Sequence, residues 1–179
     1  DARQVTRLLD ELAEDYLKLY PEADCRALAR YLFHDRGLHG AREDYYNPAN
    51  SNLAYVIDSR RGLPISLACI YILVGRRLDL EIGGCNFPGH FLARTTVDGR
   101  KVLVDCFNGG RFFEADSVVQ ASPDSPSGII EASDDPVPAK VIMLRILNNL
   151  TRAYGSIGDE PNRALMEELL LTLQIELGQ

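Results

Sequence analysis

The spacing of hydrophobic positions predicts helices at both ends of the chain. In five stretches, apolar side chains recur every three or four positions, which is the period of an amphipathic helix. These stretches are residues 3–19, 23–33, 52–60, 139–154 and 161–177. We expect Ser51 to cap the third helix and Gly62 to end it, because these residue types favour those positions. The last two helices are joined by a short glycine-containing connection, so we expect them to pack as a helical hairpin.

Residues 64–78 predict a helix of a different kind. Pro64 suits its first position, where the missing N–H of proline costs nothing. The apolar residues that follow cover nearly the whole circumference of the helix instead of one face. A helix that is apolar all round is buried all round, so we expect this to be the central helix of the fold.

A run of strand-like segments comes next, rich in β-branched and aromatic residues. The segments are residues 81–87, 90–97 and 101–106. Asp98-Gly99 between the last two is a strong signal for a tight hairpin. Residues 107–110 are expected to form a turn.

The order of helices, antiparallel sheet and helices favours an α+β fold. We expect one domain over residues 1–136, including the N-terminal helices, with the helical hairpin of residues 137–179 packed on it. Residues 34–50 and the proline-rich residues 122–138 are expected to be irregular.

Composition narrows the function classes. The formal net charge of −7, from 26 acidic and 19 basic residues, argues against a nucleic-acid partner. The longest apolar stretch, residues 63–74, is shorter than the ~20 residues that span a bilayer, so we expect no membrane partner. The four cysteines and three histidines show neither metal-ligand spacing nor a disulfide pattern. We therefore expect no metal site and reduced thiols, and with no signal-peptide pattern at the start, a cytoplasmic protein.

The hairpin register brings a histidine to a carboxylate. A two-residue turn at residues 98–99 places Leu92 opposite Asp105 and His90 opposite Phe107, with all four side chains on one face of the sheet. Asp105 is then the diagonal neighbour of His90 and lies within reach of its ring. A carboxylate in this position fixes one ring nitrogen and leaves the other to act as a base. A structural His–Asp pair has the same sequence pattern.

Turn residues flank both members of this pair, in a rigid turn before His90 and a flexible one after Asp105. Gly89 precedes His90, and Asn108 follows Asp105 in a glycine-containing turn. Binding and catalytic residues favour such positions, so we treat Gly89, Phe107 and Asn108 as candidate binding residues. Asn86 is a further candidate, either as an oxyanion donor or as an ordinary turn residue.

Several motifs resemble the bacterial SirB-like branch of the transglutaminase-like superfamily, whose fold is papain-like. They are Arg61-Gly-Leu-Pro-Ile-Ser-Leu-Ala68, Asn86-Phe-Pro-Gly-His-Phe-Leu92 and Asp105-Cys-Phe-Asn-Gly-Gly110. Tyr45-Tyr46-Asn47-Pro48 is similar to the segment that precedes these motifs in that branch. The final helices look like a shortened tetratricopeptide-type extension. The resemblance covers most of the chain from about Asp10 onward and implies a buried central helix packed on a small antiparallel sheet.

In that superfamily, a cysteine at the start of the central helix attacks an acyl group, and its His and Asp partners follow on strands. The resemblance implies that His90 and Asp105 match the last two of these positions. The helix start is Gly62-Leu-Pro-Ile-Ser66 and contains no thiol. Three interpretations stay open: Ser66 replaces the nucleophile, Cys69 one turn deeper replaces it, or the site has none. Ser66 in a purely backbone-bonding role and Cys69 in core packing are the structural alternatives.

Our leading hypothesis is a transglutaminase-like domain that lacks the usual nucleophilic cysteine and binds a peptide or protein partner in a non-catalytic, regulatory role. The alternative is an active acyl-transfer enzyme or peptidase, in which Ser66 or, less favourably, Cys69 is the nucleophile. His90 would then be the base and Asp105 the residue that orients it. Neither hypothesis implies a cofactor.

Overall fold

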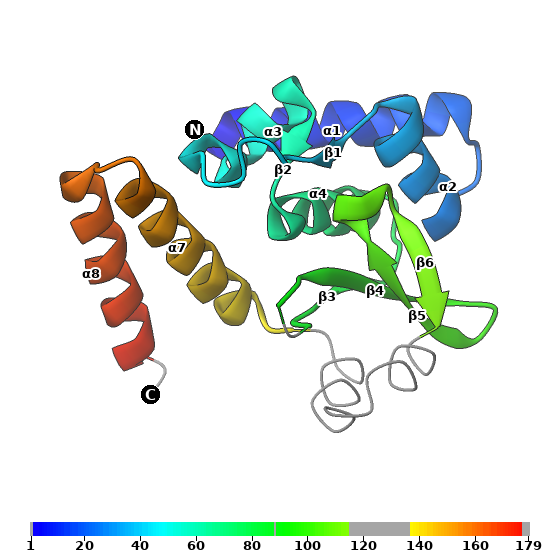
Figure 1. Ribbon diagram of the computed structural model, residues 1–179. Helices are drawn as coiled ribbons and strands as arrows, with labels where there is room; N and C mark the ends of the chain where they lie inside the picture. The colour runs from blue at the N-terminus through cyan, green and yellow to red at the C-terminus, as the bar shows by residue number, and fades with distance from the viewer. Residues whose placement is uncertain (1, 88, 115–136, 177–179) are drawn as a thin grey trace.

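An antiparallel sheet of four strands carries the residues of the candidate site. In the computed structural model, which describes residues 2–87, 89–114 and 137–176, the strands lie side by side in chain order. They are β3 (Ile82–Cys85), β4 (Leu92–Val97), β5 (Arg100–Asp105) and β6 (Arg111–Glu114) (Figure 1). A separate parallel pair consists of two short strands, β1 (His39–Gly40) and β2 (Arg61–Gly62).

The helices flank the sheet and extend away from it. They are α1 (Ala2–Leu19), α2 (Cys25–Arg30), α3 (Leu53–Ser59), α4 (Pro64–Arg77), α7 (Ala139–Ser156) and α8 (Glu160–Glu176). Single helical turns connect them: the π-helical η1 (Tyr31–Asp35) and the 3-10 turns η2 (Pro48–Ser51) and η3 (Cys106–Asn108). The chain therefore has the expected α+β fold. Within the described ranges, none of these helices combines the length and the apolar character needed to cross a bilayer.

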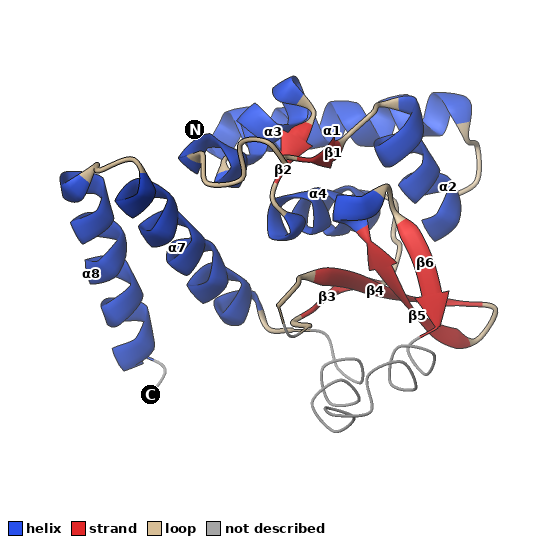
Figure 2. Cartoon of the chain, viewed as in Figure 1, coloured by secondary structure: helices blue, strands red, loops and turns tan. Residues whose placement is uncertain are grey.

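Helix α4 is the central helix, as its sequence predicts. Figure 2 shows it between the N-terminal helices on one side and the sheet on the other. Its side chains from Leu67 to Ile70 and on to Val74 are almost entirely buried in the main core. Each large apolar side chain buried in this way contributes about 1.5–3 kcal/mol. The one phenol of the helix, Tyr71, donates a 2.8 Å hydrogen bond to the carbonyl of Cys25, so its burial leaves no donor unpaired.

The hairpin register also follows the prediction. The β4–β5 pairs run from Val97–Arg100 to Ala93–Val104. Asp98 and Gly99 have positive φ angles of 52° and 74°, as a two-residue hairpin turn requires. Beyond Ala93 the ladder ends, so the predicted pairings of Leu92 with Asp105 and of His90 with Phe107 lie outside it.

Three local predictions are wrong. Asn52 caps α3 instead of Ser51, because its side-chain oxygen accepts from the backbone N–H groups of Ala54 and Tyr55. The helix ends at Arg60, which adopts a left-handed conformation with φ 63°, two residues before Gly62. The strand expected from residue 90 begins at Leu92, because a turn occupies the residues before it.

Strands β1, β2 and β6 were not expected. The first two are only two residues long, which is too short for any periodicity to appear. Strand β6 follows two glycines of positive φ that reverse the chain immediately after η3. Its residues pair with β5 from Val102–Glu114 to Asp105–Arg111.

Helices α7 and α8 form the expected hairpin, and α7 joins it to the rest of the molecule. The N–H of Val137 donates to the carbonyl of Gly84 on β3 at 3.0 Å, and Ile142 and Ile146 pack on the main core. The division at residue 136 and most of the proposed irregular segment 122–138 lie outside the described residues. The two-part division of the chain therefore stays a prediction.

Core packing around α4 generates the first prediction. Leu67→Ala should lower the free energy of unfolding by about 2–5 kcal/mol, because it leaves a cavity in a site that is fully buried. Urea denaturation would measure the change. The control, Leu19→Ala, truncates a side chain that is 64% exposed and should change stability by less than about 0.5 kcal/mol. Equal effects of the two variants would show that α4 is not the core.

Candidate functional site

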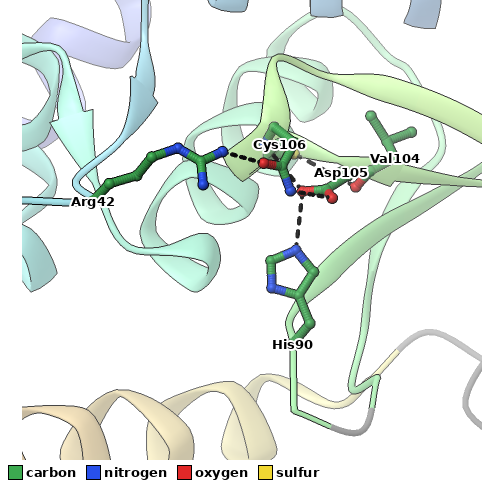
Figure 3. Close-up of polar contacts among 6 residues, drawn as sticks. Arg42, His90, Val104, Asp105 and Cys106 are labelled. Atoms are coloured by element: carbon green, nitrogen blue, oxygen red, sulfur yellow. Dashed lines mark hydrogen bonds and ion pairs between the residues drawn. The ribbon is translucent and has the colours of Figure 1, made fainter. Parts of the chain in front are cut away.

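The structure brings His90 and Asp105 together. Nε2 of His90 lies 3.0 Å from Oδ1 of Asp105, with both side chains partly buried (Figure 3). Among the described residues, the other ring nitrogen, Nδ1, has no hydrogen-bond partner. The carboxylate can therefore orient the ring and leave Nδ1 to face a ligand.

Asp105 is fixed from its other side by Asn108. The Asp105 side chain caps the 3-10 turn η3, since Oδ1 accepts from the backbone N–H of Asn108 at 3.1 Å. Oδ2 accepts from the Asn108 side-chain amide at 2.7 Å. Burial raises the pKa of Asp105, but the hydrogen bonds from His90 and Asn108 together outweigh it and hold the pKa below its usual value. The carboxylate is thus kept ionised by groups that also fix its position.

A tight turn delivers His90 to this carboxylate. The N–H of His90 donates to the carbonyl of Phe87 at 3.0 Å, which closes a four-residue turn. Gly89, the third residue of that turn, has φ 73°, a conformation that favours glycine. Phe91 follows directly and is buried in the core, so the chain is anchored on the far side of His90. Gly89 therefore positions the histidine through its backbone.

Ser66 faces a backbone carbonyl. Its hydroxyl donates to the carbonyl of Asn50 at 2.8 Å, and only 1% of the residue is exposed. The expected alternative for this serine was a bond to N–H groups of its own helical turn, and the partner is instead an acceptor 16 residues away. The hydroxyl proton is thus directed at a carbonyl oxygen that cannot take it up as a base would.

The cysteines near α4 are poor nucleophiles. Burial raises the pKa of the Cys69 thiol to about 11, and that of Cys85 to about 11 as well. Burial also raises the pKa of Cys106, which lies fully inside the core. A thiolate is the reactive form, and these surroundings disfavour it. Within the described ranges, no group of three or more His, Cys, Asp or Glu residues is arranged to hold a metal ion.

Aromatic rings border the His90–Asp105 pair on one side. Phe107 lies edge-on to His90, with ring centroids 6.1 Å apart, and edge-on to Tyr45 at 6.2 Å. The ring centroids of Tyr46 and Tyr45 lie 5.4 Å apart, and Tyr46 is 58% exposed. The guanidinium of Arg42 lies 5.1 Å above the Phe107 ring. We call Arg42, Tyr45, Tyr46 and Phe107 the aromatic rim.

Arg42 also connects the aromatic rim to the His90–Asp105 pair. Its guanidinium donates to the side-chain oxygen of Asn108, the residue that holds Asp105. Figure 3 shows Arg42 reaching toward Asp105 from one side while His90 approaches from another. A single polar chain therefore runs from the rim to the histidine.

Helix α7 borders the other side of the site. Arg145 donates to the side-chain oxygen of Asn86 and lies 5.6 Å from the centre of the Phe91 ring. Burial lowers the pKa of Arg145, and the nearby Tyr45 opposes this, which shows that α7 and the rim are close enough to interact. Asn86 is exposed and engaged by Arg145; its role as an oxyanion donor stays a prediction.

The candidate residues thus divide into two groups. His90, Asp105, Phe107 and Asn108 meet at one place, and Gly89 shapes the backbone that leads to it. Ser66 and Asn86 form the second group, because they are engaged elsewhere, by Asn50 and Arg145. The sequence pattern missed Arg42 and Arg145, because both come from segments without a motif of their own. The Tyr45-Tyr46 pair in the motif that precedes the central helix was the available signal for the rim.

Comparisons with known proteins extend these observations. Residues 2–148 match the family model described as the transglutaminase-like superfamily. A UPF0162 protein of Xylella fastidiosa (strain Temecula1 / ATCC 700964) is 42% identical over 138 residues, which are 73% of this chain and 48% of that protein. A UPF0162 protein of Xylella fastidiosa (strain 9a5c) is 39% identical over 155 residues, 82% of this chain and 54% of that protein. Human F-box only protein 21 is 34% identical over 79 residues, 44% of this chain and 13% of that protein.

The chain therefore spans about half the length of the two Xylella relatives. No solved structure matches it.

The hydrogen bonds of Asp105 predict a pH dependence. The lowered pKa of Asp105 in the folded state means that its contribution to stability is present above the unfolded pKa of about 3.9 and is lost as the pH falls through the folded value. Asp105→Asn should lower the free energy of unfolding at pH 7 by about 1–3 kcal/mol, because an amide has one accepting oxygen for three donors. The deficit should shrink as the pH falls below about 4 and through the lowered folded pKa.

Urea titrations at pH 7 and in acid would measure this deficit. Asp58→Asn, at an exposed position of α3, is the control and should show no such pH dependence. A deficit that stays constant down to the most acidic condition would contradict the ionised network.

Proposed function

The chain belongs to the transglutaminase-like superfamily, and from that premise we propose that it binds a peptide segment of a protein partner at the His90–Asp105 site without forming a covalent bond to it. The observation that carries the proposal is that an ordered His–Asp pair faces an exposed aromatic rim while the helix-start hydroxyl of Ser66 is turned to Asn50. The pair then acts as a hydrogen-bonding element of a binding surface.

The surroundings of the residues that could attack an acyl group support a non-catalytic role. A serine nucleophile needs an adjacent base to remove its proton, and the Ser66 proton is donated to a carbonyl in a buried position. A cysteine nucleophile needs a lowered pKa, and burial raises that of Cys69. The acyl-transfer alternative requires one of these groups to leave its present environment.

The composition of the rim supports a protein ligand. Tyrosine, phenylalanine and arginine are enriched at protein interfaces and at the residues that dominate binding energy. Tyr46 presents most of its ring to solvent, and Phe107 connects it to His90 through edge-on contacts. An extended peptide that lies on the rim would reach Nδ1 of His90.

The charges at the site favour an acidic segment. Arg42 bonds to Asn108 and Arg145 bonds to Asn86, and in the described part of the chain neither arginine forms an ion pair with a carboxylate. Both guanidinium groups bond to asparagine oxygens, which a carboxylate would replace with a stronger, charge-assisted bond. Acidic side chains or a terminal carboxylate on the partner would supply it.

We propose a finer placement of the chain as well. The three motifs, with the Tyr45-Tyr46-Asn47-Pro48 segment before them, support membership of the SirB-like branch. The paired helices α7 and α8 support a tetratricopeptide-type extension, shortened to a single pair. The free thiols of all four cysteines support a cytoplasmic location, because they suit a reducing compartment.

Absence of turnover is the first test. The purified chain should release no product from acyl-ester, amide and glutamine-donor substrates beyond the background rate, because in the described part of the chain Ser66 is hydrogen-bonded to Asn50 and burial raises the pKa of Cys69. Ester and amide hydrolysis and amine incorporation would be followed in parallel. Turnover that is lost in both His90→Ala and Ser66→Ala would overturn the proposal and establish the acyl-transfer alternative.

Peptide binding is the second test. Peptides selected on the chain from a random twelve-residue display library should be rich in acidic residues. Tyr46→Ala and Arg42→Gln should each weaken the binding of a selected peptide by about tenfold or more, as expected for central interface residues. Fluorescence anisotropy would give the affinities.

Two matched substitutions control for general effects. Leu19→Ala and Arg100→Gln change an exposed apolar and an exposed basic side chain away from the rim and should alter the affinity by less than about twofold. Selected peptides whose affinity is equal in all four variants would show that the rim is not the binding surface.

A further inference from the structure

A cavity lies at the edge of the sheet, between β3, β4 and the beginning of α7, apart from the His90–Asp105 site. Its volume is about 380 Å³, within the range of small-molecule pockets. Its lining comes from four segments that are separate in the sequence: the end of α4, strands β3 and β4, and the residues that enter α7. None of the lining residues belongs to the site around His90.

One arginine of this lining, Arg94, has a buried donor atom without a partner. Nη1 of Arg94 is buried and has no hydrogen-bond partner among the described residues. Taking a charged group out of water costs several kcal/mol unless a counter-charge or hydrogen bonds compensate. Buried polar groups without a partner are rare in folded proteins, and a bound ion or small molecule is a common reason for them. The position of Arg94 therefore points to an anionic partner.

The charge of the cavity lining is positive. Arg76, in the last turn of α4, and Arg94 contribute two positive charges, and Glu81 contributes one negative charge, which leaves a formal charge of +1. In the described part of the chain, no ion pair joins Glu81 to either arginine. A ligand with a single negative charge would neutralise the lining.

The rest of the lining is suited to an apolar body. Ile72, Ile82 and Ile142 face the cavity from α4, β3 and α7, with Val137 and Ala139 beside them. A guanidinium presents parallel N–H donors that match the two oxygens of a carboxylate. The lining therefore combines one recognition point for a carboxylate with an aliphatic wall.

We propose that this cavity binds a small organic carboxylate. The carboxylate group accepts a hydrogen bond from the buried donor of Arg94. It is also attracted by the charge of Arg76 at the solvent-exposed edge of the cavity. The aliphatic part of the ligand lies against the isoleucines. This site is independent of the proposed peptide surface, because the two share no residue.

Hexanoate is a suitable probe, with hexanamide as its neutral counterpart and inorganic phosphate as a simple oxyanion. In a titration followed by ¹H–¹⁵N NMR, hexanoate should shift the amide signals of Gly84, Thr95 and Thr96 in a saturable manner. Hexanamide should bind at least about tenfold more weakly, because it lacks the charge-assisted hydrogen bond. Phosphate should also bind more weakly, because it lacks the aliphatic part.

Substitutions assign the effect to Arg94. Arg94→Gln should weaken hexanoate binding at least about tenfold, and Arg76→Gln, at an exposed position, should weaken it to a smaller extent. Arg100→Gln, which removes a surface arginine paired with Glu114, is the matched control and should leave the affinity unchanged. Arg94→Lys keeps the charge but not the paired donors, and serves if the glutamine variant does not fold.

Several outcomes would overturn the proposal. No saturable binding of hexanoate to the unmodified chain would do so without any variant. Equal binding of hexanamide would mean an apolar cavity without anion recognition, and equal binding of phosphate would mean an adventitious ion only. Affinity unchanged in both Arg94 variants would place the anion elsewhere.

Discussion

Helix α4 is apolar on every side, and the rest of the chain is arranged to cover it. The N-terminal helices cover one side and the sheet covers the other, so most side chains of the helix are buried, while Arg76 in its last turn is exposed. Polar groups on such a helix must find partners inside the protein. Tyr71 finds the carbonyl of Cys25, and Ser66 finds that of Asn50. The same burial that stabilises the fold removes the helix start from the chemistry that a superfamily nucleophile would perform there.

The His90–Asp105 pair is maintained by local interactions. Asp105 ends β5 and caps η3, so its carboxylate has a structural partner in Asn108 whatever His90 does. The ring of His90 is held by a turn that Gly89 permits and by the buried Phe91 that follows. A His–Asp pair in this superfamily is therefore consistent with binding as well as with catalysis. The residues around the pair determine which of the two roles it has.

Much of the fold and the centre of the site could be predicted from the sequence, where the signal was local. The all-apolar segment fixed the position of α4, and Asp98-Gly99 fixed the hairpin register that brings Asp105 near His90. The contact between His90 and Asp105 forms differently from the prediction, because His90 lies in a turn before β4 and not within the strand. Non-local features had no sequence signal: the bond from Ser66 to Asn50 spans 16 residues, and that from Arg42 to Asn108 spans 66. Tertiary packing alone brings such pairs together.

Phe107, the member of the aromatic rim that lies next to His90, packs against Gly40, a position that has no side chain. A Cβ atom at residue 40 on β1 would lie 2.5 Å from Cε2 of this ring, well inside contact distance. The ring is rigid and is held between His90, Tyr45 and Arg42, so it has little freedom to withdraw. Any side chain at residue 40 would therefore require the Phe107 ring to shift, and the position of that ring beside His90 would change with it. A residue without a functional group of its own thus determines the shape of the protein next to the His90–Asp105 pair.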